Sequence, residues 1–231
     1  MEFERTKKLF EEEKFNVLKT KSILILGMGG VGSFACEAIA RSGINNIIIV
    51  DKDVVDITNI NRQLIALHST IGKSKVELMK ERILDINKNA VVTTYHQFYN
   101  FDTKDQIWEN KIDFVIDCID TITFKIDIIK ECLSRKIPFI SSMGQANKMH
   151  PELLEIADIK DTTYDKIAKV IRLKLKKERI YGKVPVVYSK ETSDKTFIKE
   201  EGLPSNSFVP SSAGLLAASY AINTLLSEVK L

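Results

Sequence analysis

Cysteine is scarce in this sequence, which argues against two kinds of architecture. The three cysteines, Cys36, Cys118 and Cys132, include no Cys-x-x-Cys pair and no cluster with histidine. Disulfide frameworks and structural zinc sites need such groupings. We therefore expect neither, and a reducing compartment fits the chain best.

Long hydrophobic runs and a strong net charge are also missing. An apolar stretch near the C-terminus, residues 213–226, has fourteen residues, fewer than the roughly 20 that span a bilayer as a helix. The charged start, MEFERTKKLFEEEKF, lacks the apolar core of a signal peptide. A net charge of +3 over 231 residues is too small for a general polyanion binder. We expect a cytoplasmic, globular protein without membrane contact.

What the chain does contain is an alternation of short apolar runs and helical patterns. Residues 22–27 and 46–51 are near-continuous apolar runs, as strands buried on both faces should be. Between them lies a helical pattern that stops at Gly43. The order predicts an α/β, Rossmann-like, doubly wound and mainly parallel sheet. It continues with predicted helices over 74–87, 103–109 and 122–135, and strands over 91–98, 113–120 and 138–143.

After Gly144 the alternation stops. We expect a basic amphipathic helix over 161–180, a strand over 184–189, and a loop over 202–214 that leads into a final apolar helix. The chain is predicted to be one domain, 1–231. Its nucleotide-binding half is 1–143, and 144–231 form a C-terminal substrate-binding extension that carries the crossover, the basic helix and dimer contacts.

A glycine-rich stretch follows the first predicted strand and opens a helix. Gly27, Gly29 and Gly32 have G-x-G-x-x-G spacing, which lets a phosphate approach backbone N–H groups at a helix N-terminus. Asp51 ends the next strand, where a carboxylate accepts hydrogen bonds from ribose hydroxyls. The motif indicates a nucleotide but does not choose between NAD and ATP.

A polar cluster after the second strand favours a nucleoside triphosphate. Adenylyl transfer needs cations over the phosphates, and Arg62 and Lys75 are suitable. Asn59, Asn61 and Gln63 add neutral hydrogen-bonding groups. The alternative is a solvated loop with ordinary surface charge.

Two carboxylates stand where a later strand ends. Asp120 is the better candidate to hold Mg²⁺ against phosphate oxygens, and N-capping of the following helix is its alternative role. Asp117 is more often structural in such a place.

Four motifs in order resemble the ubiquitin-activating-enzyme-like superfamily of ThiF and MoeB, which adenylates carboxylates with ATP: GMGGVGS, DKDVVDITNINRQ, IGKSK and DCIDTITFK. Further segments, including VVYSKE and PSSAGLLAASYAINTLL, are similar to the tRNA threonylcarbamoyladenosine dehydratases of the TcdA (CsdL) family. The resemblance implies activation of a threonyl carboxylate on tRNA, ring closure by an internal nitrogen with loss of AMP, and a homodimer. An N-terminal cation of the second subunit, Arg5, Lys7 or Lys8, would complete each site.

We can now assign candidate residues, partly from the residues and partly from the resemblance. Catalysis is assigned to Arg62, Lys75 and Asp120, with Mg²⁺ at Asp120. ATP binding is assigned to Gly27, Gly29, Gly30, Gly32, Asp51, Asp53, Asn59 and Gln63.

The basic segment supplies a candidate tRNA contact. Residues 160–183 contain nine Lys or Arg and three Asp or Glu. Contacts to tRNA phosphates are assigned to Lys166, Lys169, Lys176 and Lys177, and a solvated helical face is the alternative.

The lack of a cysteine after Cys132 argues against a thioester route, in which a thiolate attacks an acyl adenylate.

Three other functions stay open. The nearest rival adenylates the C-terminus of a ubiquitin-like sulfur carrier protein. A non-catalytic nucleotide-binding partner protein is the rival of another class, and an NAD dehydrogenase is the weakest.

Overall fold

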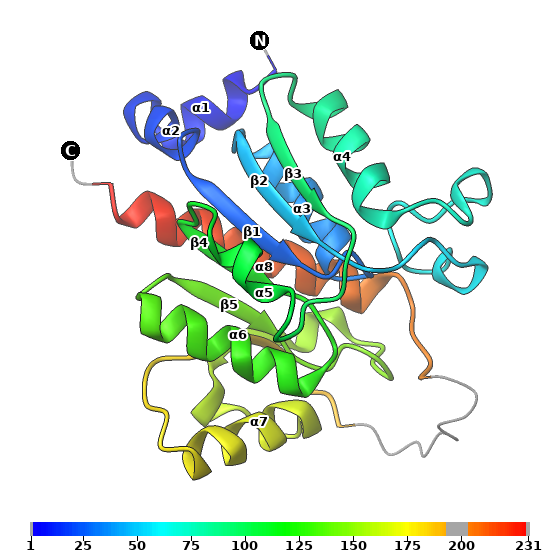
Figure 1. Cartoon of the computed structure of the whole chain (residues 1–231), viewed down its shortest axis with the longest axis vertical. Coiled ribbons are helices and arrows are strands. Elements are labelled where there is room, and N and C mark those ends of the chain that lie inside the picture. The colour runs from blue at the N-terminus through cyan, green and yellow to red at the C-terminus, as the bar shows by residue number, and fades with distance from the viewer. Residues whose placement is uncertain (1, 193–202, 230–231) are drawn as a thin grey trace.

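A computed structural model of the protein describes residues 2–192 and 203–229 (Figure 1). Its centre is a seven-stranded sheet in the order β3-β2-β1-β4-β5-β7-β6. All neighbours are parallel except β6 and β7. The predicted Rossmann-like α/β fold is therefore confirmed. The strands are β1 (Ser22–Leu26), β2 (Asn46–Val50), β3 (Val91–Tyr95), β4 (Phe114–Asp117), β5 (Phe139–Ser142), β6 (Leu154–Asp158) and β7 (Pro185–Ser189).

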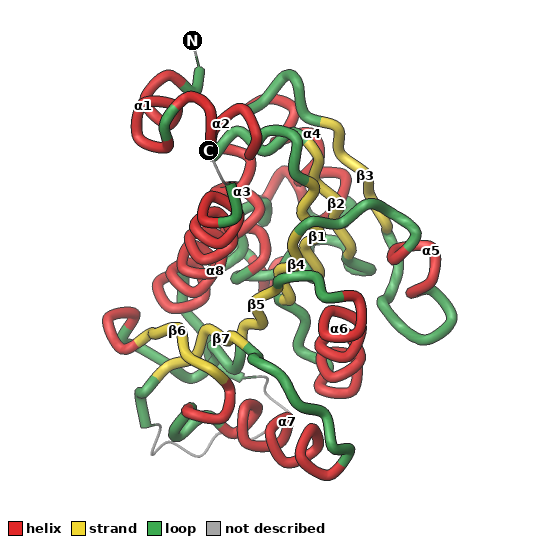
Figure 2. Tube along the Cα trace, turned by 90° about the vertical axis from the view of Figure 1, so that its left-hand side faces the viewer, coloured by secondary structure: helices red, strands yellow, loops and turns green. Residues whose placement is uncertain are grey.

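Helices cover both faces of this sheet, which makes three layers (Figures 1 and 2). In β1, Ile23 and Ile25 face a core shared with α2 (Glu12–Leu18), α3 (Gly32–Arg41), α4 (Lys75–Ile86) and α8 (Phe208–Ser227). Leu24 and Leu26 face the opposite core, which is shared with α5 (Lys104–Trp108), α6 (Ile122–Arg135) and α7 (Lys166–Lys177). This burial on both faces explains why the strands read as continuous apolar runs.

The C-terminal half differs from the expectation in three places. Strand β6 was not predicted; its half-buried side chains pair antiparallel with β7 at the sheet edge. Helix α7 begins at Lys166 rather than 161, because the Asp165 carboxylate accepts a hydrogen bond from Ala168 N at 2.8 Å and caps it.

The predicted loop over 202–214 is wrong for its second half, since α8 already begins at Phe208. The Asn206 side chain accepts from the N–H groups of Phe208 and Val209 at 2.9 and 3.0 Å. Pro210 lies in the first turn, where its missing N–H costs nothing. Gly202 lies outside the described residues.

The N-terminal segment forms two short helices that sequence analysis missed, α1 (Glu4–Phe10) and α2. They lie at the end of the sheet where β1 begins (Figure 1). Within residues 2–192 and 203–229, no helix combines the length and apolar character needed to cross a membrane.

The contact between α3 and α8 depends on a glycine. A Cβ at Gly214 would lie 2.3 Å from the carbonyl oxygen of Val31 and 3.0 Å from Ala35 N. We predict that Gly214→Ala lowers the free energy of unfolding by about 1–3 kcal/mol, even though alanine gains about 1 kcal/mol of helix propensity over glycine. Urea unfolding measures this. Ser219→Ala, an exposed change on the same helix, is the control, and a Gly214→Ala protein as stable as that control would contradict the close contact.

Candidate active site

A cavity of about 360 Å³ opens at the carboxyl ends of the strands, between β1 and β4. The strand order reverses at this point, because β2 follows β1 on one side while β4 lies on the other, and ligands of doubly wound folds bind at such a switch point. We call it the strand-end cavity. Its walls include most of the predicted nucleotide and catalytic residues: Gly27, Gly29, Gly30, Asp51, Asp53, Asn59, Arg62, Gln63, Lys75 and Asp120.

Gly32 is the exception, since it does not line this cavity. A Cβ on Gly32 would lie 1.7 Å from the carbonyl oxygen of Gly27, so the residue serves the packing of α3 against the end of β1. Gly27 has φ +88°, and its own Cβ would lie 2.9 Å from Cys118 O. Gly29 has no neighbour closer than 3.9 Å in the Cβ direction, which leaves room for a ligand in the cavity.

Asp51 is held rigidly at the mouth of the glycine loop. One carboxylate oxygen accepts from Met28 N at 2.6 Å, and the other accepts from Asp53 N at 2.7 Å. The backbone thus fixes the orientation of the carboxylate, which keeps further lone pairs for hydrogen-bond donors of a ligand.

The basic residues of the cluster approach the cavity from different elements. Lys75 begins α4 and is only 4% exposed, with its Nζ 3.2 Å from the Asp53 carboxylate. Arg62 donates from Nη1 to Thr58 O and to Asn61 Oδ1, both at 2.8 Å. One edge of the guanidinium is therefore anchored while the group lines the cavity.

Two buried amides complete this wall. Asn59 is 8% exposed, and its Oδ1 accepts from Asp56 N at 3.2 Å in a capping box. Gln63 is equally buried, and its Oε1 has no hydrogen-bond partner among the described residues. Such an orphaned acceptor beside open space fits a hydroxyl, amino or metal-bound water donor of a bound nucleotide.

Asp120 is exposed at the same cavity, just beyond β4. Among the described residues its Oδ1 accepts one hydrogen bond, from Thr121 Oγ1 at 3.3 Å. The N-cap of α6 is Thr121, so the alternative capping role does not apply to Asp120. In the described part of the chain no three His, Cys, Asp or Glu side chains form a metal cluster. A Mg²⁺ ion here would rely on one carboxylate, phosphate oxygens and water, as Mg²⁺ commonly does.

Asp117 has a structural role. It is fully buried, and its Oδ2 accepts from Lys125 Nζ at 2.9 Å and from Ser141 Oγ at 2.6 Å. Its Oδ1 accepts from Ile119 N at 3.2 Å. The ion pair thereby holds the turn that carries Asp120 to the cavity.

Sequence analysis missed one wall of the cavity, formed by Gln97 and the aromatic residues Phe98 and Tyr99. Phe98 is 37% exposed and lies edge-on to Phe124, with ring centroids 5.1 Å apart. Tyr99 is buried, and its hydroxyl donates to Asp127 at 2.8 Å. The sequence could have indicated this wall, because these residues follow β3, and the carboxyl end of β3 lies at the same end of the parallel sheet as those of β1 and β2.

A second, larger cavity of about 630 Å³ adjoins the first, and we call it the adjoining cavity. Arg62 and Asp120 line both cavities and so stand at their junction. Lys166, at the start of α7, also lines the adjoining cavity. Lys169, Lys176 and Lys177 are exposed farther along α7 and line neither cavity.

None of the cysteines offers a reactive thiolate. Burial raises the pKa of the Cys36 and Cys132 thiols far above the usual value. Cys118 stands at the junction, where burial raises its pKa to about 12. A thiol with that pKa is protonated at neutral pH, so it is a poor nucleophile.

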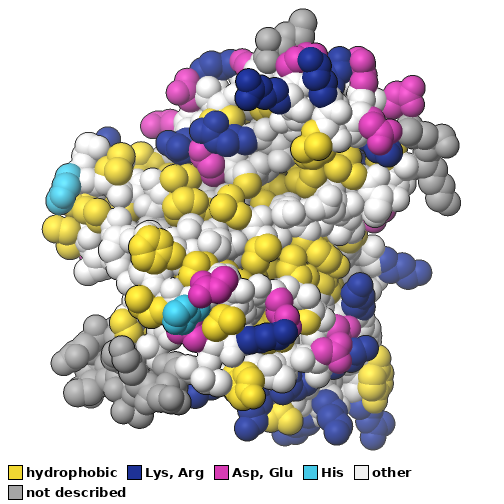
Figure 3. All heavy atoms as spheres, turned by 180° about the vertical axis from the view of Figure 1, so that it is seen from behind, with side chains coloured by type: hydrophobic (Ala, Val, Ile, Leu, Met, Phe, Trp, Pro, Cys, Tyr) yellow, Lys and Arg dark blue, Asp and Glu magenta, His cyan; other side chains and the backbone are white. Residues whose placement is uncertain are grey.

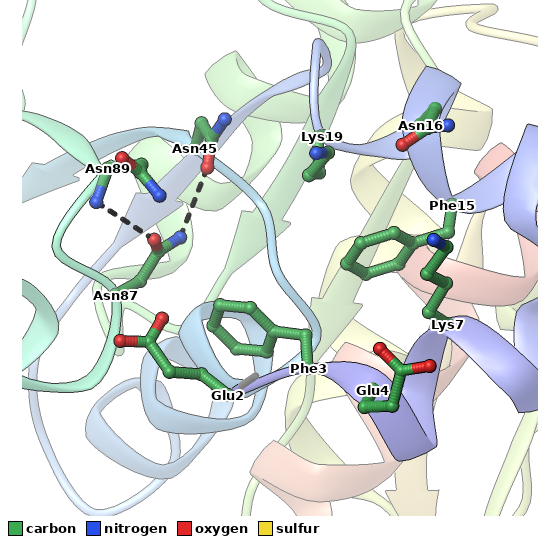
Figure 4. Close-up of a pocket in the computed structure, with 10 residues that line it drawn as sticks. All are labelled: Glu2, Phe3, Glu4, Lys7, Phe15, Asn16, Lys19, Asn45, Asn87 and Asn89. Atoms are coloured by element: carbon green, nitrogen blue, oxygen red, sulfur yellow. Dashed lines mark hydrogen bonds between the residues drawn. The ribbon is translucent and has the colours of Figure 1, made fainter.

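The N-terminal cations lie far from this site, at the opposite end of the strands, where β1 begins. Lys7 lines a separate cavity together with Phe3, Asn45 and Asn87, residues that adjoin α1 or precede β2 and β3 (Figure 4). Its Nζ is paired with Glu12 at 2.6 Å. An N-terminal cation of this chain therefore does not reach its own strand-end cavity.

Comparison with known proteins identifies the family. The model of the ThiF family matches residues 3–227, almost the whole chain. The chain belongs to the ThiF family. It is similar to the tRNA threonylcarbamoyladenosine dehydratase of Bacillus subtilis, with 46% identity over 245 aligned residues that cover 100% of this chain and 96% of that one. The superfamily resemblance seen in the motifs is thus confirmed.

Solved structures of ThiF-family relatives agree. The chain is similar to the E. coli dehydratase TcdA in complex with ATP, with a TM-score of 0.91, 32% identity, and coverage of 98% of this chain and 94% of that one. It is also similar to TcdA in complex with AMP, with a TM-score of 0.90, 32% identity, and coverage of 97% and 93%.

The buried ion pair under the site gives a test of its construction. We predict that Lys125→Met lowers the free energy of unfolding by about 3–5 kcal/mol, because it leaves the Asp117 carboxylate buried without its cation. Lys130→Met removes an ion pair with Glu178 at a side chain that is 42% exposed and should cost no more than about 1 kcal/mol.

The double variant Asp117→Asn/Lys125→Met removes the unpaired charge and should recover part of the loss. Denaturant unfolding of the three proteins decides the question. Equal stability of Lys125→Met and Lys130→Met would contradict the assigned role.

Proposed function

We propose that this ThiF-family protein is an ATP-dependent tRNA threonylcarbamoyladenosine dehydratase. It adenylates the threonyl carboxylate of the modified nucleoside and closes a ring with net loss of water. The observation that carries the proposal is the junction: Arg62 and Asp120 line a cavity suited to a nucleotide and an adjoining cavity large enough for a second substrate. Similarity to the B. subtilis dehydratase along the whole chain supports this choice of substrate.

ATP would occupy the strand-end cavity. The open side of Gly29 admits the phosphates, Asp51 accepts from the ribose hydroxyls, and Phe98 and Tyr99 border the space left for the base. Lys75 and Arg62 place positive charge beside the phosphate chain. Asp120 would hold Mg²⁺, which supplies charge neutralisation at the phosphate oxygens.

The reaction balances in two steps. A carboxylate oxygen of the threonyl group attacks the α-phosphorus, the bond to the bridging oxygen breaks, and pyrophosphate leaves with its electron pair. An internal nitrogen of the nucleoside then attacks the activated carbonyl carbon and loses a proton. AMP departs with the original carboxylate oxygen. Arg62 stabilises the charge that develops on the α-phosphate, since it stands where the two substrates meet.

Such a sequence needs no enzyme thiol. A nitrogen of the same nucleoside can attack in place of an enzyme thiol, because it is already held beside the carbonyl carbon. The protonated state of Cys118, the cysteine at the junction, is consistent with this route.

The tRNA would lie along α7. Figure 3 shows Lys and Arg side chains gathered at the end of the molecule where Figure 1 places this helix. Lys166, Lys169, Lys176 and Lys177 are exposed there. Since Lys166 also lines the adjoining cavity, a backbone bound on this helix would lead into that cavity.

A homodimer completes the proposal. Arg5, Lys7 and Lys8 lie on α1, away from their own strand-end cavity, so a cation from this segment would have to enter the cavity of a second copy. Hydrophobic side chains form a band across the middle of the face in Figure 3. Leu215 on α8 is 50% exposed and Phe208 60%, which suits a subunit contact. We place this work in the cytoplasm.

The test is AMP release from ATP and Mg²⁺ by the purified protein, with and without tRNA that carries threonylcarbamoyladenosine. We expect tRNA-dependent AMP and a nucleoside lighter by one water. AMP release that ignores tRNA but responds to a ubiquitin-like carrier protein would favour the rival substrate, and ATP binding without turnover would favour a binding protein.

Removing either junction residue should stop the chemistry and spare the fold. We predict that Arg62→Ala and Asp120→Ala each lower the rate of AMP formation by roughly 100–1,000-fold, because each removes transition-state charge stabilisation. Asp85→Ala and Lys88→Ala break an exposed ion pair that lines neither cavity and are the controls. Retained turnover in both junction variants, with thermal unfolding unchanged, would refute the assignment.

Lysines on α7 should act through phosphates alone. We predict that Lys176→Ala/Lys177→Ala weakens the binding of modified and unmodified tRNA alike, and lowers the slope of log affinity against log salt by about 2. Lys88→Ala/Lys111→Ala removes two exposed lysines elsewhere and should leave the slope unchanged. Identical slopes for the two double variants would remove α7 from the tRNA surface.

A further inference from the structure

Among the described residues, few buried side-chain nitrogen or oxygen atoms lack a hydrogen-bond partner, and one of them belongs to a residue that lines the adjoining cavity. In residues 2–192 and 203–229 three such atoms occur: Gln63 Oε1, Ser74 Oγ and Gln145 Oε1. Gln63 belongs to the strand-end cavity and Gln145 to the adjoining cavity. A buried polar atom left unpaired is costly. Each cavity therefore holds an acceptor that a ligand can satisfy.

The orientation of the Gln145 amide is fixed. The residue is only 7% exposed. Its Nε2 donates to Ser142 Oγ at 3.3 Å and to Val187 O at 3.2 Å. A flipped amide would place Oε1 against the Val187 carbonyl oxygen, and two acceptors repel each other. Oε1 therefore stays the free acceptor and calls for an N–H or O–H donor.

An exposed aromatic ring lines the same cavity. Tyr164 is 70% exposed although it lines the adjoining cavity. It has φ +61°, and a hydrogen bond from Asp165 N to Thr163 O at 2.7 Å closes a tight turn around it. A bulky residue rarely adopts this conformation. The turn directly precedes α7, whose first residue, Lys166, also lines the adjoining cavity.

We propose that the adjoining cavity is a subsite for the modified nucleoside, in which Tyr164 stacks on the purine ring and Gln145 Oε1 accepts a hydrogen bond from the threonyl-side N–H of the carbamoyl link. The inference rests on the proposed function and adds the residues that read the substrate.

The chemistry of the two groups matches the two parts of that nucleoside. Proteins recognise single-stranded RNA by stacking unpaired bases on aromatic rings. The carbamoyl link is a urea, and its N–H on the threonyl side is a donor that an unmodified adenosine lacks. A site with a buried acceptor rejects an analogue that lacks the donor, because the acceptor is then left unpaired. Gln145 would thus distinguish modified from unmodified tRNA, while Tyr164 would bind both.

Arrangement of the cavities supports the assignment. The adjoining cavity shares Arg62 and Asp120 with the strand-end cavity, so a carboxylate on a nucleoside held there faces the α-phosphate side. Lys166 on the same wall suits the phosphate of the flanking nucleotide.

The experiment compares four variants for binding of modified and unmodified tRNA of one sequence, and for steady-state AMP formation. Tyr164→Ala removes the ring and Tyr164→Phe keeps it. Gln145→Met removes the acceptor at similar length. Tyr181→Ala removes a tyrosine that is 80% exposed and lines neither cavity, and it is the matched control.

We expect Tyr164→Ala to weaken both tRNAs by roughly tenfold, with Tyr164→Phe and Tyr181→Ala near wild type. Gln145→Met should raise KM for modified tRNA by roughly tenfold, and leave the binding of unmodified tRNA and the KM for ATP unchanged. A merely structural role would shift the KM for ATP and the binding of both tRNAs together.

The outcomes separate two failures. Wild-type protein without tRNA-dependent AMP release overturns the proposed function and the inference with it. If the wild-type protein turns over normally, two results overturn the inference and leave the proposed function standing. One is that Tyr164→Ala behaves like Tyr181→Ala. The other is that Gln145→Met affects the binding of both tRNAs equally.

Discussion

The close approach of three backbone segments, made possible by two glycines, determines the geometry of the site. A side chain at Gly32 would occupy the carbonyl oxygen of Gly27, and one at Gly27 would strike the backbone of Cys118. Without these side chains, α3 starts directly against the end of β1, and the turn after β4 lies beside both. The strand-end cavity exists because these three segments meet.

The charged side chains at the junction are held in position by buried and backbone groups that lie beneath them. The buried pair of Lys125 and Asp117 anchors the turn that presents Asp120. Hydrogen bonds to Thr58 O and Asn61 Oδ1 anchor one edge of Arg62. Preorganised groups of this kind need no rearrangement when charge develops in a reaction, which is why they stabilise transition states well. The same arrangement lets one pair of side chains serve both cavities.

Much of this could be read from the sequence, because buried parallel strands appear as continuous apolar runs and site residues follow strand ends. The rest depends on tertiary contacts. Strand β6 was missed because a half-buried edge strand has only a weak alternation of apolar and polar residues. Gly32 was assigned to the nucleotide because the sequence does not show how closely its backbone approaches the carbonyl oxygen of Gly27. The free acceptor of Gln145 follows from the hydrogen bonds of its own amide, so no motif could indicate it.

The central claim is that the threonyl carboxylate of the nucleoside attacks the α-phosphorus of ATP. The most direct test gives the protein ATP, Mg²⁺ and tRNA whose threonyl carboxylate carries heavy oxygen in both positions, followed by mass analysis of the nucleotide product. The account predicts AMP that has gained one heavy oxygen, with the second retained in the cyclised nucleoside. Unlabelled AMP, or ADP in its place, would contradict it.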